Sequence, residues 1–194
     1  MAADDERPGP GADSRTLALS DGVFAIAMTL LVLSIGMPRP GEHEHLGAVL
    51  WDHNAQLFSW LLSFAVLGAA WVRHRRLLSS VHDIDRTLTL LNLAYLGAVA
   101  FLPYPTEVLG TYGSRPAAIG LYAVTTALLS GSGSLMARHA RDARLLWPGA
   151  EHPTTPGDRW WTVPVILLLA IPLSQLVGGK ALLLWLLLPF ARRR

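Results

Sequence analysis

The sequence predicts an all-α fold, a polytopic integral membrane protein with six transmembrane helices. Hydrophobic residues make up 52% of the 194-residue chain and charged residues 15%, whereas an ordinary soluble domain carries roughly 25% charged residues. Long apolar runs recur along the chain, and the basic residues lie between them in a one-sided pattern. Because the chain has no cysteine, disulfides, thiol nucleophiles and thiolate metal sites are excluded.

The chain begins with a polar segment. Residues 1–14 contain an acidic triplet and Pro-Gly repeats, which predict a disordered cytoplasmic tail. The apolar run that follows is too long for the h-region of a signal peptide and has no small-residue cleavage site. We therefore expect residues 17–36 to form the first transmembrane helix.

Five apolar runs approach the roughly 20 residues that a helix needs to cross a bilayer core. Only the first contains a charge, Asp21. A sixth run, residues 181–191, is short and would reach only about 16 Å at the helical rise per residue. Lys180 can extend it by snorkelling. The predicted spans are 17–36, 55–72, 87–106, 116–137, 160–179 and 180–191.

The distribution of basic residues supports six spans with both termini in the cytoplasm. Under this topology thirteen of the sixteen Lys and Arg residues lie inside, and only Arg39, Arg115 and Lys180 lie outside, as the positive-inside rule requires. Five spans would place the C-terminal Arg triplet outside. The excess of Arg over Lys, with much Ala, Gly and Pro, indicates a GC-rich bacterial genome and therefore a bacterial inner or plasma membrane.

The first span carries the main candidate functional residues. Asp21 lies one turn into it, and charged residues inside a membrane are costly and commonly functional. An acid near a helix N-terminus is also stabilised by the helix dipole, so a structural role fits as well. Ile26, Leu30 and Leu33 lie at i, i+4 and i+7 and share one helical face, with Thr29 beside them. On spacing alone, this face contacts lipid or another helix.

Residues 15–33 also form a motif. Arg15 is followed by Leu19-Ser20-Asp21, by Ala25-Ile26 and by a Thr-Leu-Leu-x-Leu sequence. This motif resembles the signature of the prokaryotic members of the transmembrane protein 175 family of potassium channels. Leu19 stands where the family has Phe. The matching residues are Arg15, Ser20, Asp21, Ala25, Ile26, Thr29, Leu30, Leu31 and Leu33.

A second block resembles the same family in the expected order. It consists of Trp71 and His74 in a Trp-x-x-His sequence, Asn92 in a Leu-Asn-Leu sequence, and a Phe-Leu-Pro-Tyr ending at residues 101–104. Together the two blocks cover about residues 15–106. The second half of the chain matches only as generic hydrophobic spans.

The resemblance implies a potassium-selective, leak-type channel built as a homotetramer whose first helices line a central pore. Ile26 would be the principal constriction, with Leu30 and Leu33 forming further apolar rings and Thr29 hydroxyls nearby. Selectivity would not come from a ring of carbonyls, because the chain contains no Thr-Val-Gly-Tyr-Gly filter. The expected partners are copies of the chain itself, membrane lipids and the permeant potassium ion, with no other cofactor or metal.

The resemblance further implies a structural network between helices. It would join Ser20 and Asp21 to His74 and Asn92, with Arg15 at its edge. The physical reason is that a buried carboxylate must be paired or hydrogen-bonded. Under this interpretation Asp21 supports assembly and does not bind the ion.

Other interpretations remain open. A proton-coupled transporter could use Asp21, although such carriers usually show internal repeats and helices broken at matching depths. A structural membrane protein without conduction is the third possibility. The loop 42–45 (Glu-His-Glu-His) resembles a metal-ligand cluster but lacks a complete ligand set. No catalytic constellation is present, and the basic blocks flank membrane spans, which argues against an enzyme and against nucleic-acid binding.

Overall fold

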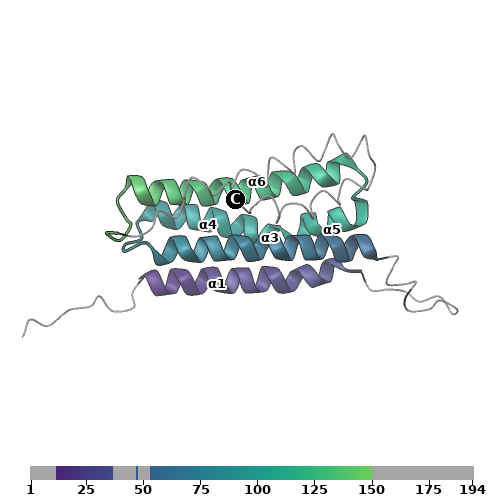
Figure 1. Cartoon of the computed structure of the whole chain (residues 1–194), viewed down its shortest axis with the longest axis horizontal. Coiled ribbons are helices and arrows are strands. Elements are labelled where there is room, and N and C mark those ends of the chain that lie inside the picture. The colour runs from purple at the N-terminus through teal and green to yellow at the C-terminus, as the bar shows by residue number, and fades with distance from the viewer. Residues whose placement is uncertain (1–11, 37–46, 48–52, 150–194) are drawn as a thin grey trace, which may run out of the picture.

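The computed structural model describes residues 12–36, 47 and 53–149. Within these ranges the chain is helical apart from turns and one isolated β-bridge, and the long helices run side by side along one axis (Figure 1). The predicted spans at 160–179 and 180–191, the tail up to residue 11 and the loop at 42–45 lie outside the described residues. The elements are α1 (Ala12–Leu30), η1 (Leu31–Ser34), α3 (Asn54–Ser79), α4 (Arg86–Phe101), α5 (Pro103–Tyr112) and α6 (Pro116–Asp142).

Four helical segments in the described part are long and apolar enough to cross a membrane. They are Arg15–Ser34, Asn54–Ser79, Arg86–Tyr112 and Pro116–Asp142, and α4 and α5 together make the third. The chain is therefore a multi-pass membrane protein.

All four spans extend beyond their predicted limits. Helix α1 begins at Ala12 instead of residue 17, the third span ends at Tyr112 instead of residue 106, and α3 and α6 continue past their predicted C-terminal ends. Helix α3 runs to Ser79 and α6 to Asp142, whereas the apolar runs end at residues 72 and 137. Both extensions are rich in arginine. Arg can keep its charged head in water while its stem lies along apolar surface, so a helix continues from the bilayer into the aqueous phase without a break.

The third span is broken at Leu102, although its apolar run predicted one continuous helix. Pro103 and Pro105 lack the N–H groups that would continue the hydrogen-bond ladder, and the chain restarts as α5 at Pro103. Thr106 donates its backbone N–H and its hydroxyl to the carbonyl of Leu102, at 3.2 and 2.8 Å. This carbonyl is therefore satisfied inside the membrane, as lipid-facing backbone requires.

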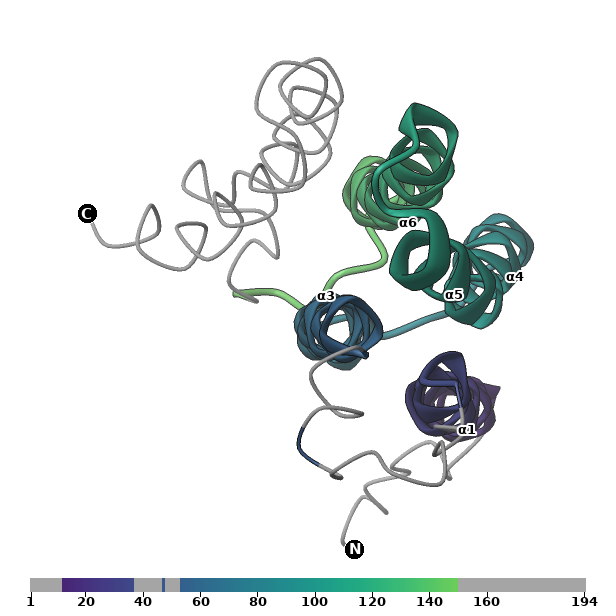
Figure 2. The same ribbon diagram turned by 90° about the vertical axis from the view of Figure 1, so that its right-hand side faces the viewer.

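The core lies where α4, α5 and α6 meet the other helices. Helix α4 packs against α6 and α1, while α5 packs against α3, α6 and η1. Viewed from the α5 end, α1 lies at the edge of the bundle next to α3 (Figure 2). Large side chains that are almost completely buried include Phe24, Leu31, Leu67, Leu88, Val99, Tyr122, Leu129 and Met136.

Candidate functional site

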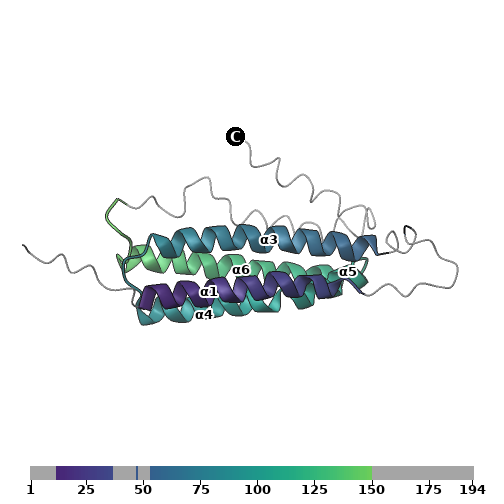
Figure 3. The same cartoon turned by 90° about the horizontal axis from the view of Figure 1, so that it is seen from below.

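Helix α1 has one buried face and one exposed face. Ser20, Phe24, Ala27 and Leu31 are at most 1% exposed, and their spacing of three or four residues places them on one side of the helix. This side packs against α3 and α4, and the helix runs along the outside of the bundle (Figure 3). The opposite side of α1 is therefore uncovered by the described part of its own chain.

The predicted apolar face of α1 is the uncovered one. Ile26 is 62% exposed, Leu30 is 43% exposed and Leu33 is 71% exposed. Gly22 and Ala25 are exposed on the same side, and small residues of this kind allow another helix to approach closely in a membrane. The exposed side of α1 can accordingly contact lipid, or further copies of the chain around a shared axis.

Thr29 is the polar residue on this face. Its hydroxyl donates to the carbonyl of Ile26 at 2.8 Å, which is the common behaviour of a mid-helix Thr. The donated proton leaves the oxygen lone pairs free to accept. The exposed face thus combines apolar side chains with one hydroxyl oxygen that can face an ion.

The end of the first span is wound more tightly than the rest. Residues Leu31–Ser34 form the 3-10 helix η1, and Ser34 donates its hydroxyl to the carbonyl of Leu31. Side chains three residues apart eclipse one another in a 3-10 helix. Leu30 and Leu33 consequently remain on the same exposed side although the helix changes its winding.

A buried polar cluster lies behind the exposed face. The His74 Nε2 atom lies 2.7 Å from the Asn92 side-chain oxygen, and the Asn92 amide donates to the Ser20 hydroxyl at 3.3 Å. The Ser20 hydroxyl in turn donates to the Thr16 carbonyl at 2.8 Å. The three side chains are 5%, 2% and 1% exposed, for His74, Asn92 and Ser20 respectively. This chain of contacts connects α3, α4 and α1.

Aromatic rings pack around the His74 side chain of this cluster. The His74 ring stacks on Tyr95 with centroids 5.0 Å apart and an interplanar angle of 13°. Phe24 packs against His74 at 5.6 Å. Tyr95 donates its hydroxyl to the Ala70 carbonyl at 3.2 Å. The imidazole is thus held by its neighbours on the ring face as well as at Nε2.

Asp21 contacts α3 through a different residue. It is exposed and accepts a hydrogen bond from Trp71 Nε1 at 2.7 Å. The expectation that this carboxylate is buried and bonded to His74 and Asn92 is therefore wrong. Consecutive residues of a helix point about 100° apart, so Ser20 and Asp21 reach different neighbours. The structure brings Ser20, His74 and Asn92 together and joins Asp21 to Trp71 instead.

Arg15 is exposed at the start of α1, on the same end as Asp21. In the sequence Trp71 belongs to the Trp-x-x-His block, and its position three residues before His74 is the signal for its role. One helical turn places the two side chains on the same side of α3, facing the first helix.

A second buried cluster was missed by the sequence reasoning. The Ser63 hydroxyl lies 3.0 Å from the Tyr122 hydroxyl and 2.8 Å from the Thr106 hydroxyl. These residues join α3, α6 and α5 immediately after the break at Leu102. Ser59 and Ser63, one turn apart and buried, were the sequence signal for a polar contact on this side of α3.

The described residues contain no group of three or more His, Asp or Glu side chains that could hold a metal ion. The loop at 42–45, which raised that possibility, lies outside the described part. The candidate site is therefore α1, where an exposed apolar face lies in front of a hydrogen-bonded polar cluster.

Comparison with known proteins places these features in context. Residues 15–103 match the family model described as the endosomal/lysosomal potassium channel TMEM175. A potassium channel of Streptomyces collinus is 44% identical over 101 residues, which are 50% of this chain and 48% of that protein. A potassium channel of Chamaesiphon minutus is 39% identical over 118 residues, covering 58% of this chain and 57% of that protein.

A more distant relative and a solved structure are also similar to this chain. The human endosomal/lysosomal proton channel TMEM175 is 30% identical over 128 residues, 62% of this chain and 24% of that protein. The crystal structure of a lysosomal potassium-selective channel TMEM175 homolog from Chamaesiphon minutus superposes with a TM-score of 0.72 at 28% identity, over 94% of this chain and 98% of that chain. The chain spans about half the length of the two bacterial relatives that it matches.

Proposed function

We propose that the chain is a subunit of a potassium-selective, leak-type channel of the transmembrane protein 175 family, whose model matches residues 15–103. The observation that carries the proposal is the exposed apolar face of α1, with Ile26 62% exposed and Leu33 71% exposed. A pore-lining helix needs one face packed on its own subunit and the other free to face the ion path.

Ile26 forms the constriction in this proposal, and Leu30 and Leu33 form further apolar rings. An apolar ring gates by excluding water, and it favours the cation that sheds its hydration shell at lower cost. Potassium holds its water less tightly than sodium, so a narrow ring penalises sodium more. The Thr29 oxygen, with its proton directed at the Ile26 carbonyl, offers a compensating acceptor nearby.

Several copies of the chain are needed to enclose such a pore. One copy contributes only a single α1, and the uncovered side of that helix is the one with Ile26, Leu30 and Leu33. We propose a homotetramer with six spans per subunit. Both termini face the cytoplasm of a bacterial cell, because that orientation puts most of the arginines inside.

The test compares two polar substitutions at positions of equal exposure. Ile26→Asn lies on α1, whereas Leu128→Asn lies on α6, and both side chains are 62% exposed. Each purified variant is reconstituted in planar bilayers with opposing potassium and sodium gradients, both ions being present on both sides, and the reversal potential is measured. Gel filtration establishes that each variant is assembled.

The expected result is a reversal near the potassium equilibrium value for the unmodified protein and for Leu128→Asn. Ile26→Asn should move the reversal potential toward zero, because a polar ring hydrates the constriction and removes the penalty on sodium. A selective current that is unchanged in Ile26→Asn would refute the constriction. Failure of the assembled protein to carry any current would refute the channel and favour a carrier or a structural protein.

A further inference from the structure

Two loops are joined at the end of the bundle where α3 and α6 terminate. The turn between α3 and α4 lies against the segment that follows α6 (Figure 1), with Val81 and Leu146 paired in an antiparallel bridge. His82 donates its backbone N–H to the Leu145 carbonyl at 2.8 Å, and Trp147 donates its own to the Ser80 carbonyl at 3.0 Å. We call this pairing the seam.

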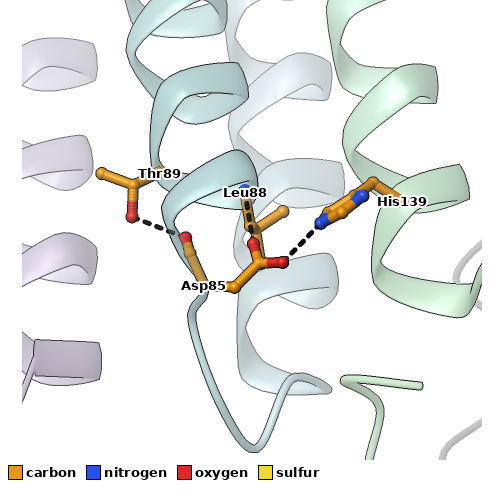
Figure 4. Close-up of polar contacts among 4 residues, drawn as sticks. All are labelled: Asp85, Leu88, Thr89 and His139. Atoms are coloured by element: carbon orange, nitrogen blue, oxygen red, sulfur yellow. Dashed lines mark hydrogen bonds and ion pairs between the residues drawn. The ribbon is translucent and has the colours of Figure 1, made fainter. Parts of the chain in front are cut away.

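One side-chain contact reinforces the seam and links two helices directly. Asp85 is the N-cap of α4, and its Oδ1 atom accepts the backbone N–H of Leu88 at 2.6 Å. Its Oδ2 atom lies 2.7 Å from Nε2 of His139 in the last turn of α6. The Asp85 carbonyl also accepts the Thr89 hydroxyl at 2.9 Å. Figure 4 shows the carboxylate between the start of α4 and the imidazole.

Both side chains of this pair are accessible to protons from solvent. His139 is 25% exposed and Asp85 is 35% exposed. The Leu88 N–H, and then the hydrogen bond from His139, hold the pKa of the Asp85 carboxyl below its usual range. Asp85 therefore stays negative across the neutral range, where an imidazole changes its charge.

Other titratable groups at this end are engaged differently. On α6, Arg138 pairs with Asp142 at 3.7 Å within the same helix, and Arg141 Nε donates to the Ala137 carbonyl at 3.3 Å. His82 lies 3.2 Å from the Arg144 carbonyl, a neutral acceptor. The remaining charged groups of the turn and of the start of α4 are the exposed Asp83 and Arg86. Among the described residues, Asp85 and His139 are thus the ion pair that joins two separate elements.

We propose that Asp85 and His139 form a proton-sensitive clamp that fastens the last turn of α6 to the start of α4. With His139 protonated, the contact is an ion pair with a charge-assisted hydrogen bond. With His139 neutral, it is a hydrogen bond without the second charge. Acidic solution on this side therefore tightens the seam and alkaline solution loosens it. The clamp does not depend on which ion the protein conducts.

A reporter for the seam can be built because the natural chain has no cysteine. Ala140 is 0% exposed, follows His139, and its carbonyl accepts the Leu145 N–H at 2.9 Å. In Ala140→Cys the thiol reacts with a maleimide only when the seam opens. Its labelling rate is measured in the assembled protein at pH 6 and pH 8, and each rate is divided by that of the denatured protein at the same pH.

The normalised rate should rise roughly two- to five-fold from pH 6 to pH 8, the range expected for a partly exposed ion pair. His139→Gln keeps a hydrogen-bond donor but cannot titrate, so it should abolish this rise. Asp85→Asn keeps an N-cap acceptor and should abolish it too. Asp142→Asn, which removes only the pair within α6, should leave the rise intact.

Two results of the labelling experiment would overturn the clamp. One is an unchanged rise in His139→Gln, and the other is a rise that disappears in His82→Gln instead. Hydrogen exchange of residues 136–145 in the cysteine-free protein, corrected for intrinsic rates, provides a second readout that needs no buried thiol. The corrected exchange rate should rise by the same two- to five-fold from pH 6 to pH 8. Equal protection at both pH values would contradict the proposal.

Discussion

Gly110 lies where α5 packs closely against α3, and Gly110→Ala should destabilise the protein. A Cβ atom at this position would lie 2.7 Å from Ser59 Oγ and 3.1 Å from Gln56 Cα. The residue lies on α5, which packs against both α3 and η1. The contact therefore sets how closely α5, the second part of the third span, approaches its neighbours.

The magnitude follows from the atoms that the methyl group would meet. Ordinary carbon–carbon contacts are about 3.5–4.0 Å, so α3 and α5 must separate by about 0.4 Å at the Gln56 backbone. The Ser59 hydroxyl must also rotate, which breaks its 2.9 Å hydrogen bond to the Gln56 carbonyl. Overpacking of this kind costs about 1–3 kcal/mol, and the loss outweighs the helical preference of Ala over Gly, about 1 kcal/mol.

The assay is thermal unfolding of the assembled protein in detergent, followed by tryptophan fluorescence. Gly97→Ala and Gly131→Ala serve as controls on two other helices, because a Cβ at either position meets nothing within 4 Å in the described chain. Gly110→Ala should lower the midpoint, whereas the controls should leave it unchanged or raise it. A midpoint for Gly110→Ala equal to that of the controls would refute the close approach of α3 and α5.

Four other outcomes are expected. Tyr122→Phe removes one buried interhelical hydrogen bond and should cost about 0.6 kcal/mol, at most about 1.7, measured by unfolding in detergent. Leu31→Ala, at a side chain 0% exposed, should cost about 2–5 kcal/mol, whereas the exposed Ile26→Ala should change stability by about 0.5 kcal/mol or less. Asp21→Ala should lower the yield of assembled protein in gel filtration before it alters selectivity. The stabilisation of the folded protein by Asp85 should be complete above the ordinary Asp pKa of about 3.9 and should disappear as pH falls through the lowered pKa of Asp85. The measurement is unfolding stability against pH in acid, and an equally steep loss of stability in Asp85→Asn would contradict this prediction.

The apolar runs and the motifs predicted much of what the structure shows. The all-α class and the four described spans follow from long apolar segments, because only a helix satisfies its own backbone in lipid. The family resemblance, which rested on two short blocks, is confirmed by the match over residues 15–103. Ile26 and Leu33 lie on one side of the helix, as their i, i+7 spacing predicts, since helical periodicity fixes which residues share a side; that this side is exposed comes from the structure.

Other features depend on contacts between distant segments. The motif grouped Asp21 with His74, but the angle between consecutive helical residues sends Ser20 to that cluster and Asp21 to Trp71. The break at Leu102 was missed because hydropathy ignores the N–H groups that proline removes. The partnership of Ser63 with Tyr122, 59 positions apart, leaves no periodic signal in the sequence.

The central claim is that the exposed face of α1 lines the ion path, and thiol accessibility tests it most directly. Ile26→Cys and Leu128→Cys, at side chains of equal exposure, are introduced singly into the chain, which has no other cysteine. Current through each reconstituted variant is recorded before and after a water-soluble methanethiosulfonate reagent. Modification should block the current of Ile26→Cys and leave that of Leu128→Cys unchanged. An undiminished current in Ile26→Cys, with labelling of the thiol verified by mass, would contradict the claim.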